Sequence, residues 1–317
     1  MREQVILQLA LANGIGDAAI KKILKAMEYD SIGWSSVLNN EFLVGRLNLP
    51  LDIVNSIYEQ KSRSMEILSG LSNQHIEILL INDARYPKRL LHSFKEKSPA
   101  ILYVQGNISL LNQKTVGFCG SRKSSLKGLS ITHNCAQQLA ENNIVIVSGY
   151  AAGVDLAAHK SALKNGGNTI FVLPEGILRK SIKNEIKHYL SDSNHVFVSQ
   201  FMPEITWNSI NAMKRNEVII GISDAMILVE SGLSGGTFAA GERTLTVNHP
   251  LFVIDFAKPE VSAEANPYFI SKGGIPIRGR EGVPRLNKVF DIVNNRIFHS
   301  DPEQMSLDIN LPSKKEV

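Results

Sequence analysis

The sequence has little cysteine, with only Cys119 and Cys135 among its 317 residues. Two cysteines are too few for a disulfide framework, and no Cys and His residues stand at the spacing of a zinc site. This usage indicates a reducing compartment, so we expect a cytoplasmic protein. No apolar run is long enough to span a bilayer, and the N-terminus lacks the pattern of a secretory signal. We therefore expect no membrane partner.

The sequence also has only a small excess of positive charge, because 34 Lys and Arg residues against 30 Asp and Glu residues give a net charge of +4. A surplus this small permits binding to a polyanion only where the basic residues cluster. The sequence also lacks a Gly-x-Ser-x-Gly nucleophile elbow and a Walker lysine motif. We predict no catalytic residue, no metal and no cofactor, and hence a binding protein rather than an enzyme.

What is present indicates a globular protein with more than one domain, because 44% of the residues are apolar and the chain exceeds the usual size of a single core. The predicted domains are residues 1–75, 76–285 and 286–317. The first is a small N-terminal helical domain, and the third is a helix over 287–298 followed by a tail. The second is predicted to alternate between two element types: strands at 76–81, 100–104, 114–119, 144–148, 168–173, 195–199, 224–229 and 251–255, and helices at 127–141, 155–165, 183–191, 207–221 and 236–247.

These alternating elements predict the fold class. Continuous apolar strands such as Ile170-Phe171-Val172-Leu173 are typical of a parallel sheet that is covered on both faces. We predict an α/β fold with an extended, Rossmann-like, doubly wound, mostly parallel sheet. Ligands of such folds bind at the carboxyl ends of the strands.

The N-terminal helical domain contains a Gly-x-Gly turn, Gly14-Ile15-Gly16, between two short helices. Such a turn is found in helix-hairpin-helix elements, whose amides can meet a DNA phosphate. The alternative is a tight helical turn with Asp17 as the N-cap of the second helix.

Four strand ends of the main domain are rich in glycine and polar residues: Gly120-Ser121-Arg122, Ser148-Gly149, Pro174-Glu175-Gly176 and Ser231 to Thr237. Because parallel strands end at one edge of the sheet, these segments are expected to line one groove. Glycine and serine allow backbone N–H groups to approach an anion closely, and an arginine adds a fixed fork of donors. The pattern indicates phosphate recognition.

Basic residues follow the same strand ends and would extend the groove into a track for a sugar-phosphate backbone. They are Arg122, Lys123, Lys127, Lys160, Arg179, Lys180, Lys183, Lys214 and Arg215. Phe118, Tyr150, Phe171 and Trp207 are candidates for base stacking, with core packing as the alternative. The full predicted nucleic-acid site is Gly120, Ser121, Arg122, Ser148, Gly149, Lys160, Lys183, Asn184, Lys214, Arg215, Gly235, Gly236 and Thr237.

Titratable residues near the predicted groove could have either a catalytic or a structural role. Asp155 and His159 lie four residues apart on one helix face, where an acid and a base could act together. Asp155 could equally cap the helix or orient Arg122, and His159 could simply pack beside the groove. We favour these structural roles, and treat Glu175, Glu230 and Glu242 only as possible acids.

Taken together, the order and spacing of these motifs resemble the DprA/Smf family. The resemblance rests on Gly120-Ser121-Arg122, the segment Ser148 to Asp155, Ala158 to Leu163, Val172 to Gly176, Lys214 to Ser223 and Glu230 to Thr237. It covers about residues 75 to 280. It implies a single-stranded DNA-binding recombination mediator of natural transformation or recombination, which dimerises and assists the loading of RecA. Ser121, Arg122, Lys160 and Arg215 would then contact phosphates, while Ser148, Gly149, Gly235 and Gly236 would shape the groove floor.

The sequence also departs from the family pattern. Glu217 stands where a second arginine is usual, which removes a positive charge. Ser199-Gln200 stands where Ser-Glu is usual, Ile254-Asp255 where Pro-Gly is usual, and Arg179 to Asn184 replaces a Tyr-Pro-x-x-Asn run. The C-terminal part is too short for the winged-helix module of many members. The resemblance therefore implies a divergent member.

The alternative function is a small-molecule nucleotide site on the same kind of fold. Gly235-Gly236-Thr237 and Glu242 are similar to the glycine-rich loop and glutamate of lysine-decarboxylase-like phosphoribohydrolases, although their spacing differs. This alternative covers a hydrolase of nucleoside monophosphates and a nucleotide sensor in a defence system.

Overall fold

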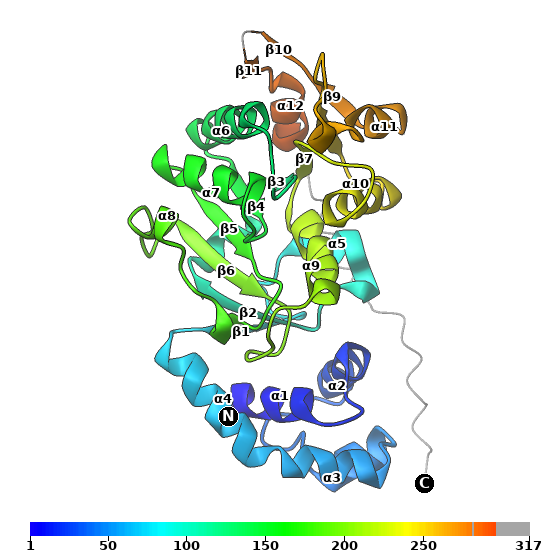
Figure 1. Cartoon of the computed structure of the whole chain (residues 1–317). Helices are drawn as coiled ribbons and strands as arrows, with labels where there is room; N and C mark the ends of the chain where they lie inside the picture. The colour runs from blue at the N-terminus through cyan, green and yellow to red at the C-terminus, as the bar shows by residue number, and fades with distance from the viewer. Residues whose placement is uncertain (281, 296–317) are drawn as a thin grey trace. The chain divides into compact units, whose positions relative to one another are not determined.

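The computed structural model describes residues 1–280 and 282–295. These residues form two compact units (Figure 1), one of Met1–Asp83 and Pro99–Ile101 and the other of Ala84–Ser98 and the residues from Leu102 onward. The domain limits 1–75, 76–285 and 286–317 stay a prediction. The predicted helix over 287–298 is α12, Asn287–Asn295; its last three residues and the predicted tail lie outside the described residues.

The first unit is helical, as predicted, with one short strand after the last helix. Its helices bury one apolar face each, with Ile6, Leu9, Ile23 and Ile57 almost fully covered. Its elements are α1 (Arg2–Leu11), α2 (Asp17–Tyr29), the π-helical turn η1 (Glu41–Arg46), α3 (Leu51–Glu59), α4 (Lys61–Asn73) and β1 (Glu77–Leu80).

The Gly-x-Gly turn joins α1 to α2, and its structure corrects the role of Asp17. Gly16 is the N-cap, Asp17 is the first helical residue, and its carboxylate accepts a 3.3 Å hydrogen bond from the Ala100 amide instead. The turn is fixed by the Asn13 amide, which donates to Ser56 Oγ at 2.9 Å. Whether its amides meet DNA stays a prediction.

The second unit contains a parallel sheet with helices between its strands. Its strands are β2 (Ile101–Gly106), β3 (Thr115–Cys119), β4 (Val145–Ser148), β5 (Thr169–Val172), β6 (His195–Ser199), β7 (Ala225–Leu228), β8 (Leu251–Ile254), β9 (Ile275–Ile277) and the hairpin β10 (Gly279–Arg280) and β11 (Val283–Pro284). Its helices are α5 (Lys88–Phe94), α6 (Leu126–Glu141), α7 (Val154–Lys164), α8 (Asn184–Lys187), α9 (Ser209–Ile222), α10 (Gly236–Thr246), α11 (Asn266–Ser271) and α12; its 3-10 turns are η2 (Lys95–Lys97), η3 (Ile108–Asn112), η4 (Ile177–Arg179) and η5 (Val261–Ala263).

The strand order confirms the predicted Rossmann-like, mostly parallel sheet. The strands run β2-β6-β5-β4-β3-β7-β8-β9, and every neighbouring pair is parallel except β2 with β6. Helices cover both faces (Figure 1), which explains why strands such as β5 and β7 are apolar throughout. One face packs against α6, α7 and α12, including Cys135, Ala158 and Val289. No described helix is long and apolar enough to cross a membrane.

The structure differs from the predicted elements at short segments. The helix expected over 183–191 is only four residues long, because Asn194 donates to the Tyr189 carbonyl and accepts from the Ser191 amide, which folds this segment into a turn. The helices α5 and α11 and the strand β9 were not predicted. Each has seven residues or fewer, too few to show a clear hydrophobic period.

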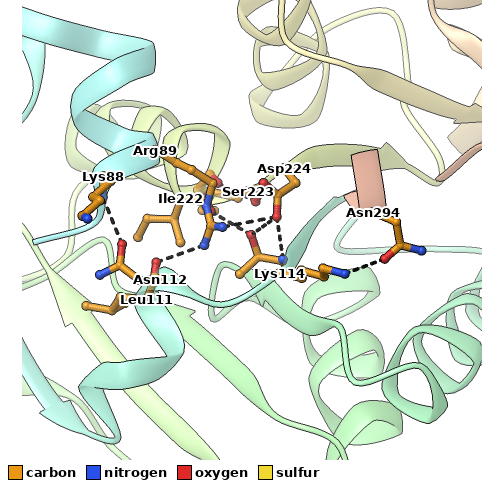
Figure 2. Close-up of polar contacts among 11 residues, drawn as sticks. Lys88, Arg89, Leu111, Asn112, Lys114, Ile222, Ser223, Asp224 and Asn294 are labelled. Atoms are coloured by element: carbon orange, nitrogen blue, oxygen red, sulfur yellow. Dashed lines mark hydrogen bonds and ion pairs between the residues drawn. The ribbon is translucent and has the colours of Figure 1, made fainter. Parts of the chain in front are cut away.

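A buried ion pair anchors α5 at the amino end of the central strands (Figure 2). Arg89 Nη1 lies 3.3 Å from Asp224 Oδ2, and both side chains are less than a tenth exposed. Arg89 also donates to the carbonyls of Ile222 and Leu111, at 2.7 and 3.1 Å. Asp224 in turn accepts from the amide of Thr115, the first residue of β3, at 2.8 Å. The pair therefore links α5 to the starts of β3 and β7.

Candidate nucleic-acid interface

The candidate site lies where the order of the strands reverses. From β3 the chain proceeds through β4, β5 and β6 on one side, and β7 then returns to pair with the other side of β3. The loops that follow β3 and β7 therefore lie at the position where folds of this class bind their ligands, at the carboxyl ends of the strands. This arrangement brings the glycine-rich strand ends to one edge of the sheet, as the sequence predicts.

Glu230, which follows β7, fixes the loop that follows β3. Its buried carboxylate accepts hydrogen bonds from Ser124 Oγ, at 2.5 Å, and from the Ser125 hydroxyl and amide, at 2.5 and 2.9 Å. Its carbonyl accepts from the Ser121 amide at 2.9 Å. Because both carboxylate oxygens are engaged, Glu230 acts as an anchor of this loop rather than as an acid. The sequence alone gave no signal for this role.

Gly153 allows the loops after β3 and β4 to pack against each other. Its φ of +78° lies in the region that favours glycine, and a Cβ there would come within 2.3 Å of the Ser121 carbonyl oxygen. The amide of Val154 donates to the same carbonyl at 3.3 Å. The backbone of Ser121 and Arg122 is thus held from two sides, while the Arg122 side chain is exposed.

Beneath these loops lies a buried charged cluster centred on Asp155. Its carboxylate lies 2.9 Å from Ser148 Oγ and accepts from the Ala151 amide at 3.3 Å. Burial raises the pKa of Asp155, an effect opposed by the positive charge of Arg215. Asp155 is the second residue of α7, whose N-cap is Gly153, so its predicted role as N-cap is wrong. The charge that acts on it is chiefly that of Arg215 rather than Arg122.

Arg215 is also buried, which gives it a place below the surface of the groove. It is 6% exposed, its Nη1 donates to the Val172 carbonyl at 2.7 Å, and its Nε has no hydrogen-bond partner in the described part of the chain. Gly149 makes room for this cluster, because a Cβ there would lie 2.2 Å from Arg215 Nη1. In this arrangement Arg215 supports the floor of the groove together with Ser148 and Gly149.

His159 belongs to the core beside this floor. Its Nε2 lies 2.7 Å from the Gly149 carbonyl, its Nδ1 lies 2.5 Å from Thr169 Oγ1, and its ring packs 4.2 Å from that of Phe171. Burial lowers the pKa of His159 to about 3. The ring is therefore neutral at pH 7, with Nε2 as the donor to Gly149. This matches the packing role that the sequence analysis favours.

The lowered pKa of His159 predicts a pH dependence of stability. Between pH 6.5 and about 3 the unfolded histidine binds a proton while the folded one does not, so the free energy of unfolding falls as the pH drops through this window. We expect His159→Gln to reduce the difference between urea midpoints at pH 7 and pH 4.5. The control is His188→Gln, which alters an exposed ring. An unchanged pH dependence in the His159 variant would contradict this assignment.

Lys183 connects the loop after β5 to the loop after β4. Its Nζ donates to the Tyr150 carbonyl at 2.8 Å and lies 4.7 Å from the centre of the Tyr150 ring, and its amide donates to the Tyr150 hydroxyl at 2.8 Å. Burial lowers the pKa of Lys183, while the charge of Asp155 opposes that shift. Lys183 therefore braces two loops in addition to its predicted contact with DNA.

The remaining predicted contacts lie at the surface. The exposed members of the predicted site are Arg122, Lys160, Asn184, Lys214, Gly235 and Gly236, and Thr237 is half-buried. Gly235 has a φ of +92° and open space where a Cβ would lie. These residues leave polar groups accessible over a buried floor, which suits an extended anionic ligand.

Several other candidates have roles away from the groove. Phe118 and Phe171 are fully buried in the core, so their proposed stacking on bases is wrong. Glu217 forms an ion pair with Arg243, with Oε1 and Nη2 2.7 Å apart, so its negative charge is balanced within the protein. Glu242 accepts a hydrogen bond from the Tyr268 side chain, which raises the pKa of that tyrosine.

Comparison with known proteins decides the family. A family model described as DNA recombination-mediator protein A matches residues 77–280. The chain belongs to this family. The resemblance to DprA/Smf proteins is thereby confirmed. The family is one of recombination mediators.

Individual relatives agree with this membership. The chain is 32% identical to DNA processing protein DprA of Streptococcus pneumoniae over 159 residues, which cover 50% of this chain and 56% of the relative. A solved structure of DprA from the same species has a TM-score of 0.73, with 24% identity, and covers 89% of this chain and 97% of that one. DNA processing protein A of Helicobacter pylori, solved to examine its single-stranded DNA binding mode, has a TM-score of 0.56 with 22% identity, over 70% and 96% of the two chains. Both structures support the same fold.

Proposed function

We propose that this protein binds single-stranded DNA along the groove at the carboxyl ends of its parallel strands. The observation that carries this proposal is that glycine-rich loops, one of them bearing the exposed Arg122, follow the strands at the point where the strand order reverses. Family membership supports a role in DNA processing, and the Helicobacter pylori relative was solved for its single-stranded DNA binding mode. The exposed cations Arg122, Lys160 and Lys214 would bind successive phosphates.

Within this groove, the exposed and the buried residues have different tasks. Arg122, Lys160 and Lys214 are exposed and would bind phosphates directly, with Ser121 and Thr237 as hydrogen-bonding neighbours. Gly235 is the N-cap of α10 and Gly236 is its first residue. Their backbone would approach the DNA strand closely, because neither residue carries a side chain. Ser148, Gly149 and Arg215 form the floor beneath. Asn184, exposed at the start of α8, would lie at one end of the track.

A titration tests the proposal directly. We expect labelled single-stranded oligonucleotides to bind more tightly than duplexes of the same length and than free nucleotides. The affinity should fall steeply between about 50 and 200 mM salt, because each bound phosphate releases counterions. No detectable binding at low salt would refute the proposal. A free nucleotide that binds more tightly than the oligonucleotide would favour the alternative nucleotide site.

We further propose that the protein acts as a homodimeric recombination mediator in the cytoplasm. It would bind incoming or exposed single strands during DNA uptake or recombination and assist the loading of RecA onto them. The test is a strand-exchange reaction with single strands that are already coated by a single-stranded DNA-binding protein. Addition of this protein should shorten the lag before RecA-dependent exchange, and an unchanged lag would contradict the loading role.

A further inference from the structure

Trp207 is a large aromatic side chain that the fold leaves half exposed at the groove. It lies in the connection from β6 to α9 and is 49% exposed. The guanidinium carbon of Arg122 lies 5.8 Å from the centre of its ring, which is within the range of a cation–π contact. An exposed indole gains little from packing against its own protein, so its position beside a cation indicates a ligand with both charge and an apolar face.

The connection that carries Trp207 is well fixed. The carbonyls of Pro203 and Ile205 accept from the amides of Leu178 and Gly176, at 2.9 and 2.8 Å. On the other side of Trp207, Asn208 caps α9 by accepting from the Asn211 amide at 2.7 Å. Because both flanks are held, the backbone at Trp207 has a defined place before any ligand binds, and little backbone entropy is lost when one does.

The contact between Arg122 and Trp207 joins two loops that follow different strands. Arg122 follows β3 and Trp207 follows β6, and β4 and β5 lie between these strands in the sheet. The helix α9 begins two residues after Trp207 and packs against β3, β4 and β5, so the connection from β6 leads back toward the loop after β3 and brings the two side chains together. A guanidinium over a ring keeps the N–H groups at its edge available for a phosphate. A phosphate site and a flat apolar surface are thereby adjacent.

We propose that Trp207 stacks on a base of the bound strand while Arg122 holds an adjacent phosphate. The inference rests on the proposed binding of single-stranded DNA and adds the feature that selects an unpaired nucleotide. In a duplex, both faces of each base are covered by neighbouring bases, so the indole has no free face to meet. Aromatic stacking accepts any base, which suits binding without sequence preference.

The two tryptophans of the chain, Trp34 and Trp207, allow a direct test. Trp34→Phe leaves Trp207 as the single reporter of fluorescence. An oligothymidylate should quench this fluorescence, whereas an abasic strand of equal length, with the same number of phosphates, should not. The abasic strand should bind about tenfold more weakly, the effect expected for the loss of one stacked base.

Variants at this position separate stacking from folding. Trp207→Ala should weaken binding of oligothymidylate about tenfold but leave binding of the abasic strand unchanged, and Trp207→Phe should retain most of the affinity. Ile210→Ala is the matched control, because Ile210 is an exposed apolar residue in the first turn of α9, three positions after Trp207. Circular dichroism and thermal melting would show that each variant is folded.

Two results would overturn the inference in distinguishable ways. If both strands bind equally well and salt-dependently, with unchanged Trp207 fluorescence, the stacking role fails while the proposed binding of the DNA backbone stands. If neither strand binds at low salt, the proposed function fails and the stacking role fails with it.

Discussion

Arg122→Ala is expected to weaken the binding of single-stranded DNA by about one to two orders of magnitude at low salt. A charge-assisted hydrogen bond contributes about 1.5–3 kcal/mol, and Arg122 is exposed on a loop that Glu230 and Gly153 hold in place. The same variant should reduce the slope of log affinity against log salt by about one, because one phosphate contact is lost. Fluorescence anisotropy at several salt concentrations measures both quantities.

Two companion variants sharpen this prediction. Arg122→Lys keeps the charge but loses the planar fork, so it should restore only part of the affinity. Lys164→Ala removes an equal charge at the last residue of α7, the end farthest from the groove, and should change binding little. If Arg122→Ala and Lys164→Ala weakened binding equally, net charge rather than the groove would account for the affinity.

Arg89→Met is expected to lower the free energy of unfolding by about 3–5 kcal/mol, because it removes the positive charge that balances the buried Asp224 carboxylate (Figure 2). The methionine retains an apolar stem of similar length, so the loss reports the charge and its hydrogen bonds. Urea denaturation followed by circular dichroism measures the change. The affinity of the folded protein for single-stranded DNA should stay the same, because the pair lies at the amino end of the strands.

The ion pair between Arg278 and Asp255 is the matched control. It joins Nε and Oδ2 at 2.7 Å, but Arg278 is 76% exposed. Arg278→Met should therefore cost at most about 1 kcal/mol, since exposed ion pairs are screened by water. A loss of less than about 1 kcal/mol in Arg89→Met would show that the buried pair contributes no more than an exposed one.

The sequence predicted the long, periodic elements of the second unit well. Strands such as β5 and β7 are continuous apolar runs, and helices such as α6 and α10 show a helical period, so local pattern and tertiary structure agree. The short helices α5 and α11 and the strand β9 were not predicted from the sequence. Their place depends on contacts with distant segments, such as Arg89 with Asp224, which no local pattern records.

The residues of the candidate site divide in the same way. The sequence placed Arg122 and the glycine-rich loops at strand ends, and strand direction alone then brings them to one edge. The burial of individual side chains could not be predicted from the sequence in this way. Arg215 resembles a surface cation in sequence but lies under Gly149, and Glu230 resembles a possible acid but anchors the loop after β3. Both roles come from neighbours far away in the chain.

The sequence by itself therefore determined the fold class, the family and the edge of the sheet where the loops meet, because these follow from periodicity and from the order of motifs. Only the tertiary structure decided which charged side chains are exposed, such as Arg122, and which are buried beneath the loops, such as Arg215 and Glu230. It also brought Arg122 to within 5.8 Å of the ring of Trp207, which lies 85 positions later in the chain. The reason is physical: side-chain burial and contact depend on strand order and loop packing, which join residues without any fixed spacing in sequence.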